Sequence, residues 1–287
     1  MTLKKVLPIC VVGISVILCF CNWRAATWLS GWDTLHPEFN FPLYLKRIFF
    51  GAWQEHQGLG ALAVQAHASD LPRMLIYFPL SLILPVPFLR FAYFFLTLAI
   101  GSLGMFYFLK HLLSDKKGIA GFVGSLFYLL NLGTLQIYYF PLEMFATLFA
   151  TLPWLFLFVS KYLSGGRKKD LVMFLFFTLF STPMAHTATL FYAYFGMLFL
   201  FILFQKSWKR GWFILFLTLA INSFWLLPNL YFVINNGQIV QNSKISTQFS
   251  ETAFLTGKQF GNLKDTLLFK NYLFDWGKYD NSKNQFF

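Results

Sequence analysis

Long uncharged stretches alternate with short polar segments along most of this chain. The stretches cover residues 6–23, 91–109, 118–142, 144–160, 171–205 and 211–243. Each is near or above the roughly 20 apolar residues that an α-helix needs to cross a bilayer. The fifth stretch is interrupted by polar residues and a proline over residues 181–186, so we interpret it as a helical hairpin. The pattern predicts an all-α transmembrane helix bundle with about seven crossings.

Two further segments lie between the first and second crossings. Residues 74–87 are apolar but contain three prolines, so we expect an interfacial or re-entrant segment there. Residues 42–53 place apolar side chains at the spacing of one helix face, with Lys46 and Arg47 on the other. Such an interfacial amphipathic helix lies flat on the membrane and holds its cations at the height of lipid phosphates. A helix that only anchors the loop is the alternative interpretation.

Composition and charge exclude a water-soluble protein. Only 12% of the 287 residues are charged, whereas soluble domains carry about 25%, and the mean hydropathy is +0.58. The net charge is +12, and the basic residues form short clusters between the uncharged stretches. The positive-inside rule therefore places these clusters and the N-terminus in the cytoplasm of a multi-pass plasma-membrane protein. Nucleic acid is set aside as a partner, and membrane lipids take its place.

This topology divides the chain into a membrane module over residues 1–234 and a polar external tail over 235–287. A long external loop covers residues 24–73. For residues 6–23, a cleaved signal peptide and an uncleaved signal anchor both fit, and the length of the apolar run favours the anchor. The tail has no recognisable terminal element, as in a fragment or a truncated relative of a longer protein.

The loop segment GWDTLHPEFN, residues 31–40, groups two carboxylates and an imidazole: Asp33, Glu38 and His36. A carboxylate at the outer membrane surface can take a proton from a hydroxyl, and a second polar group can orient it. Asp33 and Glu38 together could also hold a divalent cation, for which hard oxygen ligands favour magnesium or manganese. A solvated turn is the alternative, since Asp and Pro are common in turns.

Three other ionisable residues are candidates for the same site. Glu143 stands at the start of an uncharged stretch, where an ionisable residue is a functional candidate and a carboxylate stabilised by the helix dipole is the alternative. His186 marks the break of the predicted hairpin, and it either lines the cavity or satisfies backbone groups. His56 lies in the external loop.

The order of these features resembles the GT-C class of polyprenyl-phosphate-dependent glycosyltransferases. An aspartate follows the first helix closely, and a basic interfacial helix and an aromatic-rich bundle come after it. The residues that carry the resemblance are Asp33, Pro37, Asn40, Phe41, Arg47, Trp53, the turn at 57–60, Pro72 and Pro79. Over roughly residues 1–240 the chain is similar to the membrane domain of bacterial arabinofuranosyltransferase-like proteins.

The resemblance implies transfer of a sugar from a polyprenyl-phosphate donor to a cell-envelope glycan or lipid acceptor. Asp33 would be the catalytic base and Glu38 a second acid of the site. Arg47, Arg73 and Lys46 are candidates for the contact with the departing phosphate, with snorkelling at the interface as the alternative. The rival hypothesis is a non-catalytic membrane protein that serves lipid or polymer translocation or a structural role.

Overall fold

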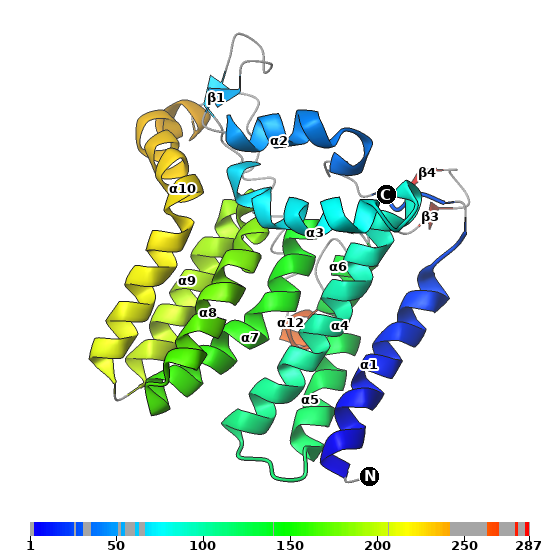
Figure 1. The fold of residues 1–287 in the computed structure, drawn as a ribbon, viewed down its shortest axis with the longest axis vertical. Coiled ribbons are helices and arrows are strands. Elements are labelled where there is room, and N and C mark those ends of the chain that lie inside the picture. The colour runs from blue at the N-terminus through cyan, green and yellow to red at the C-terminus, as the bar shows by residue number, and fades with distance from the viewer. Residues whose placement is uncertain are drawn as a thin grey trace.

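Long helices lie side by side in this protein, and two shorter helices cross one end of the bundle (Figure 1). The structure is a computed structural model that describes residues 3–25, 27–30, 36–50, 53–54, 61–62, 67–139, 141–205, 207–241, 263–269, 279–280 and 285–286. The bundle helices are α1 (Leu3–Asn22), α4 (Val86–Leu112), α5 (Ile119–Leu130), α7 (Glu143–Gly165), α8 (Lys168–Ser181), α9 (Ala188–Leu203) and α10 (Trp208–Gln241).

The remaining described elements are short. Helix α6 (Leu132–Tyr139) continues α5 after a bend, and α2 (Phe41–Phe49) and α3 (Leu71–Ser81) cross the bundle end. The 3-10 turns are η1 (Pro37–Phe39), η2 (His67–Asp70) and η3 (Thr182–His186). Strand β1 (Trp53–Gln54) pairs antiparallel with β2 (Ala61–Leu62), β3 (Tyr279–Asp280) pairs with β4 (Gln285–Phe286), and α12 is Leu263–Leu267.

The helix lengths indicate a membrane protein. Helices α1, α4, α7 and α10 are long and apolar enough to cross a bilayer, and α5 with α6 forms a fifth candidate that is bent by 53°. The predicted break of the hairpin is confirmed, because α8 ends at Ser181 and α9 begins at Ala188. These two helices have 14 and 16 residues, short of a full span, so seven crossings are not confirmed.

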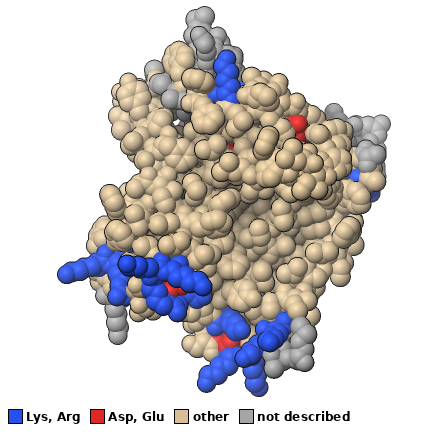
Figure 2. Space-filling model, viewed as in Figure 1, with Lys and Arg blue, Asp and Glu red and all other residues tan. Residues whose placement is uncertain are grey.

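The basic clusters share one end of the bundle. The N-terminus and the connections α4–α5, α7–α8 and α9–α10 lie at the end away from α2 and α3 (Figure 1). Lysine and arginine side chains gather there in two groups, and a broad belt with few charges separates them from the opposite end (Figure 2). The two ends of the molecule therefore differ strongly in charge, as the sequence pattern predicts.

Helix α2 is shorter than the predicted helix over residues 42–53. Its first turn is capped by Asn40, whose side chain accepts a hydrogen bond from the Leu43 N–H at 3.0 Å. The helix ends at Phe49, two residues before Gly51, which disfavours a helical backbone. Its buried face is centred on Tyr44 and Ile48, because these side chains pack against α3. Phe49, placed on the same apolar face by the sequence pattern, is 70% exposed.

The segment 74–87 is divided between two helices. Its first part belongs to α3, which lies across the bundle end, and its last residues begin α4 after Pro85. The segment thus crosses the end of the bundle before α4 begins. Together, α2 and α3 cover the end of the α4–α7 helix pair, and the buried polar side chains described below lie beneath them.

Candidate functional site: a buried charge cluster

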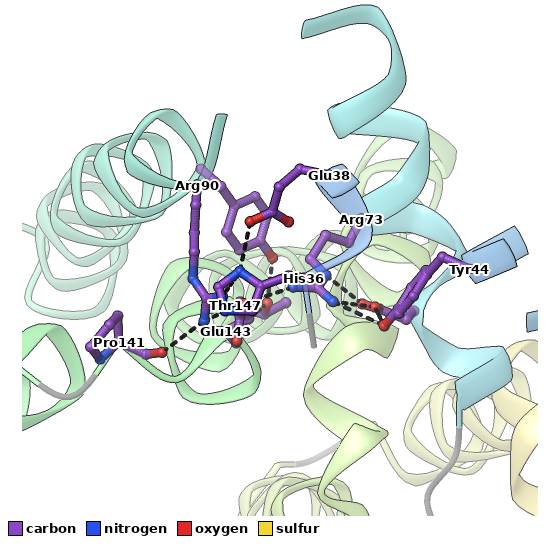
Figure 3. Close-up of polar contacts among 10 residues, drawn as sticks. His36, Glu38, Tyr44, Arg73, Arg90, Pro141, Glu143 and Thr147 are labelled. Carbon is purple, nitrogen blue, oxygen red and sulfur yellow. Dashed lines mark hydrogen bonds and ion pairs between the residues drawn. The ribbon is translucent and has the colours of Figure 1, made fainter. Parts of the chain in front are cut away.

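Five charged side chains from separate parts of the chain meet beneath α2 and α3 (Figure 3). They are Glu38 of η1, Asp70 of η2, Arg73 of α3, Arg90 of α4 and Glu143, the first residue of α7. We call this group the charge cluster. Each residue is only 1% to 6% exposed. Buried charges are stable only when they are paired and hydrogen-bonded, so the pairing within the cluster decides what it can do.

Glu143 lies between the two arginines. Its Oε1 is 2.7 Å from Arg90 Nη2 and 3.1 Å from Arg73 Nη1. The arginines approach it from different helices (Figure 3). Arg90 Nη2 also donates to the Pro141 carbonyl oxygen at 3.3 Å. One carboxylate at the start of α7 therefore joins α3 and α4 to the central helix of the bundle.

Arg73 is fully engaged on its other side. Its Nε donates to Asp70 Oδ1 at 2.7 Å and its Nη2 to Asp70 Oδ2, which is the two-pronged geometry that suits guanidinium and carboxylate. Nη2 also donates to the Tyr44 hydroxyl at 3.1 Å, and that hydroxyl donates to Asp70 Oδ2. Burial and the charge of Asp70 raise the pKa of Tyr44 well above its ordinary value, so the phenol remains a donor.

His36 links Arg90 to Glu38. Its Nδ1 is 2.9 Å from Glu38 Oε1 and 3.0 Å from Arg90 Nη1, and its Nε2 is 3.2 Å from the same arginine nitrogen. The imidazole therefore lies between a carboxylate and a guanidinium group and contacts both. Apart from this imidazole, the charge cluster contains two arginines and three carboxylates.

The charge cluster also contains polar atoms without partners. Among the described residues, Glu38 Oε2, Arg90 Nε and the Tyr77 hydroxyl are buried and make no hydrogen bond. Buried polar atoms in native proteins are nearly always paired, so such atoms point to a ligand or to water. Glu38 offers an acceptor and Arg90 a donor. This combination could receive a hydroxyl and an anionic oxygen.

An apolar cavity of about 320 Å³ opens beside the cluster. We call it the α1-side cavity, because it lies between α1, α4, α5 and α6. It is lined mainly by apolar side chains, with Phe91 directly following Arg90 in α4. Leu130 and Leu135 of its lining are exposed on the side of the bundle. The cavity is therefore open at the side of the bundle, and its α4 wall begins one residue after Arg90.

The structure brings together four of the candidates taken from the sequence. His36, Glu38, Arg73 and Glu143 all belong to the charge cluster or contact it. Asp33 and His56 lie outside the described residues. His186 packs edge-on against His67 of η2, with ring centroids 5.0 Å apart.

The predicted phosphate contacts Arg73, Lys46 and Arg47 stay predictions, and the structure places them in different surroundings. Arg73 does not snorkel toward the interface, because it is buried and its charge is neutralised by Asp70 and Glu143. Lys46 is exposed on α2, and Arg47 beside it is half-buried. Among the described residues, Arg47 Nε is buried without a hydrogen-bond partner.

The proposed metal pair of Asp33 and Glu38 stays a prediction. Within the described ranges, no group of three or more His, Cys, Asp or Glu side chains is arranged to hold a metal ion. The Oε1 of Glu38 contacts His36, and its Oε2 has no hydrogen-bond partner among the described residues. Magnesium or manganese would need Asp33, which the structure does not describe.

Sequence reasoning did not place Arg90, Asp70 and Tyr44 in the site. Arg90 stands one residue before an uncharged stretch, at the end opposite to the basic clusters. A cation at that position needs an acidic partner, and this requirement could have identified Arg90 as a candidate from the sequence. Asp70 and Arg73 are three residues apart, the spacing of an ion pair on one helix face. Tyr44 carried no such signal.

Comparison of the chain with protein-family models, with curated proteins and with solved structures finds no match. The functional proposal therefore rests on the geometry of the site and on the resemblance of its motifs.

Proposed function

We propose that this protein is an integral membrane glycosyltransferase of the GT-C type. It transfers a sugar from a polyprenyl-phosphate donor to a cell-envelope glycan or lipid acceptor, with Asp33 as the general base. The observation that carries the proposal is the charge cluster beside the α1-side cavity. Arg90 has an unpaired N–H donor and stands one residue before the wall of an apolar cavity that is open at the side of the bundle, an arrangement that suits a lipid whose phosphate is attached to a long hydrocarbon chain.

The reaction is a displacement at the anomeric carbon of the donor. The base takes the proton of the acceptor hydroxyl, the acceptor oxygen bonds to the anomeric carbon, and the bond from that carbon to the phosphate oxygen breaks. Polyprenyl phosphate leaves with the bonding electrons. Positive groups fixed where this charge develops stabilise the transition state.

Arg90 is the best placed described residue for the departing phosphate. Its Nε has no partner among the described residues, whereas Arg73 directs Nε and Nη2 to Asp70. Glu143 holds both guanidinium groups in position. Arg47 and Lys46 on α2 would contact the phosphate from the interface. Glu38 would serve as the second acid, since its free Oε2 can accept a proton or orient a hydroxyl.

The charge distribution supports an orientation in the plasma membrane. Cytoplasmic loops carry an excess of lysine and arginine, so the basic end would face the cytoplasm. The charge cluster would then lie near the external surface, where polyprenyl-linked sugars are used for envelope polymers.

The proposal is tested with purified protein in nanodiscs and a radiolabelled polyprenyl-phosphate sugar. Asp33→Asn should abolish sugar transfer and leave thermal stability and binding of labelled polyprenyl phosphate unchanged. Asp115→Asn, at the opposite end of the bundle, is the control for loss of a carboxylate with some loss of stability, and it should retain transfer. Full turnover by Asp33→Asn would reject Asp33 as the base.

A structural role is the rival that the pairing of Arg73 favours. A cluster that only joins α3, α4 and α7 would need the same ion pairs. The two functions predict different results for the variant Arg90→Gln. A transferase should lose affinity for polyprenyl phosphate in this variant, whereas a purely structural cluster should lose stability only. Binding of polyprenyl phosphate by the wild type without transfer to any acceptor would favour the non-catalytic protein.

A further inference from the structure

A second apolar cavity lies on the other side of α4. It measures about 220 Å³ and is enclosed by α3, α4, α7 and α8, so we call it the α8-side cavity. Its lining includes Ile76, Leu96, Ala150, Phe176 and Phe180. Leu96 and Phe176 are 43% and 49% exposed, so this cavity also faces the membrane side of the bundle.

Helix α4 separates the two cavities. The α4 residues of the α1-side cavity are Phe91, Phe94, Phe95 and Leu98. Those of the α8-side cavity are Tyr93, Leu96, Thr97 and Ile100. At about 100° per residue the two sets point to opposite sides of the helix, and Arg90 points between them toward α7. Arg90 therefore projects from α4 between the directions of the two cavities, and the charge cluster lies just beyond their lining residues.

Two lining residues of the α8-side cavity, Tyr93 and Thr147, make contacts that reach the backbone of Glu143 and the ring of Tyr77. The Tyr93 hydroxyl forms a hydrogen bond with Thr147 Oγ1. The Thr147 hydroxyl in turn donates to the backbone carbonyl oxygen of Glu143 at 2.7 Å. Because the threonine proton is used in this way, Tyr93 is the donor in the first bond. The Tyr93 ring also lies edge-on to Tyr77, with centroids 5.4 Å apart, and Tyr77 lies beneath the Arg73 guanidinium. The inner wall of the cavity is thus continuous with the cluster.

We propose that the α8-side cavity binds the hydrocarbon chain of the acceptor, so that the acceptor is a membrane lipid with a hydroxyl in its headgroup. This inference rests on the proposed transferase function and selects between its two classes of acceptor. A soluble glycan has no chain to place in a membrane-facing cavity. A lipid entering beside α8 reaches the cluster without crossing the path of the donor, which enters beside α1. Its headgroup hydroxyl then loses its proton to the base and bonds to the anomeric carbon.

The test uses two photoreactive lipids in nanodiscs: a phosphatidylglycerol with a diazirine in its acyl chain, and a diazirine-bearing polyprenyl phosphate. Crosslinked residues are mapped by mass spectrometry. Phosphatidylglycerol, whose headgroup carries hydroxyls, should label the α8-side cavity, and polyprenyl phosphate the α1-side cavity. Leu96→Trp, which fills the mouth of the α8-side cavity, should lower phosphatidylglycerol labelling there about ten-fold, the equivalent of about two buried methylene groups.

The matched control is Val172→Trp on the exposed surface of α8, outside both cavities, which should change neither labelling. Polyprenyl phosphate labelling and thermal stability should be unchanged in Leu96→Trp, and Ile100→Trp provides a second block at the same mouth if Leu96→Trp is unstable. Equal labelling in Leu96→Trp and the control, or labelling of one cavity by both lipids, would overturn the inference. Failure of the transferase function has a different signature, namely wild-type protein that transfers no sugar from the polyprenyl donor.

Discussion

Replacing Glu143 with glutamine removes the one carboxylate that is shared by the two buried arginines. The substitution keeps the size of the side chain, so it changes the charge without creating a cavity. Arg73 keeps Asp70 as its ion-pair partner. Among the described residues, Arg90 keeps no carboxylate partner and contacts only the Pro141 carbonyl oxygen and the His36 imidazole.

The burial of Arg90 sets the size of the effect. Its side chain is 2% exposed, so water cannot replace the lost carboxylate. Removing one partner of a buried ion pair costs about 3–5 kcal/mol, and we expect Glu143→Gln to lower the free energy of unfolding by about 3 kcal/mol, because the amide oxygen still accepts a hydrogen bond. Arg167→Gln is the matched control. It removes an ion pair of similar length, 2.8 Å to Asp170, in which the arginine is 68% exposed. Asp170 is only 7% exposed, but the arginine that is removed is accessible to water, so this loss should be smaller than that of Glu143→Gln.

The assay is reversible unfolding in mixed detergent micelles, followed by tryptophan fluorescence. The double variant Glu143→Gln with Arg90→Met tests the reasoning further, because it removes both charges together. Its loss of stability should be smaller than the sum of the two single losses by about 1–3 kcal/mol. If Glu143→Gln were no more destabilising than Arg167→Gln, the charge cluster would not be a buried, mutually dependent network.

Three further predictions use the same unfolding assay. Gly101→Ala should lose about 1–3 kcal/mol, because its Cβ would lie 2.7 Å from the Phe149 carbonyl oxygen, whereas Gly196→Ala, with open space, should lose nothing. Tyr44→Phe should lose about 1–3 kcal/mol with its buried hydrogen bonds to Asp70 and Arg73; an unchanged stability would contradict those bonds. Slight burial raises the pKa of Asp115, but four backbone N–H donors outweigh it and hold the pKa below its ordinary 3.8. The ionised carboxylate of Asp115 therefore stabilises the folded protein above pH 3.8, and this stabilisation is lost as the pH falls through the lower pKa of the folded state. The difference in Tm between wild type and Asp115→Asn should accordingly shrink in acid.

The sequence by itself determined the class of protein and much of its layout. Uncharged stretches near 20 residues have one stable arrangement in lipid, the hydrogen-bonded helix, so the bundle follows from composition and spacing. The break near His186, the first position of Glu143 in α7 and the shared end of the basic clusters were all readable from local patterns. Each depends on near neighbours in the chain or on the cost of burying a charge.

The tertiary structure decided which charges meet. Arg73 and Glu143 are 70 positions apart in the sequence. Only the packing of α3 across the end of α4 and α7 brings Arg73 Nη1 to 3.1 Å from Glu143 Oε1. Arg90 was not recognised, because a single arginine beside an apolar stretch has many possible partners and periodicity does not select among them. The two cavities on opposite sides of α4 likewise arise from helix packing, since a cavity is space that several distant segments leave between them. Helix positions followed from local rules, whereas the site depended on contacts between helices that no local pattern specifies.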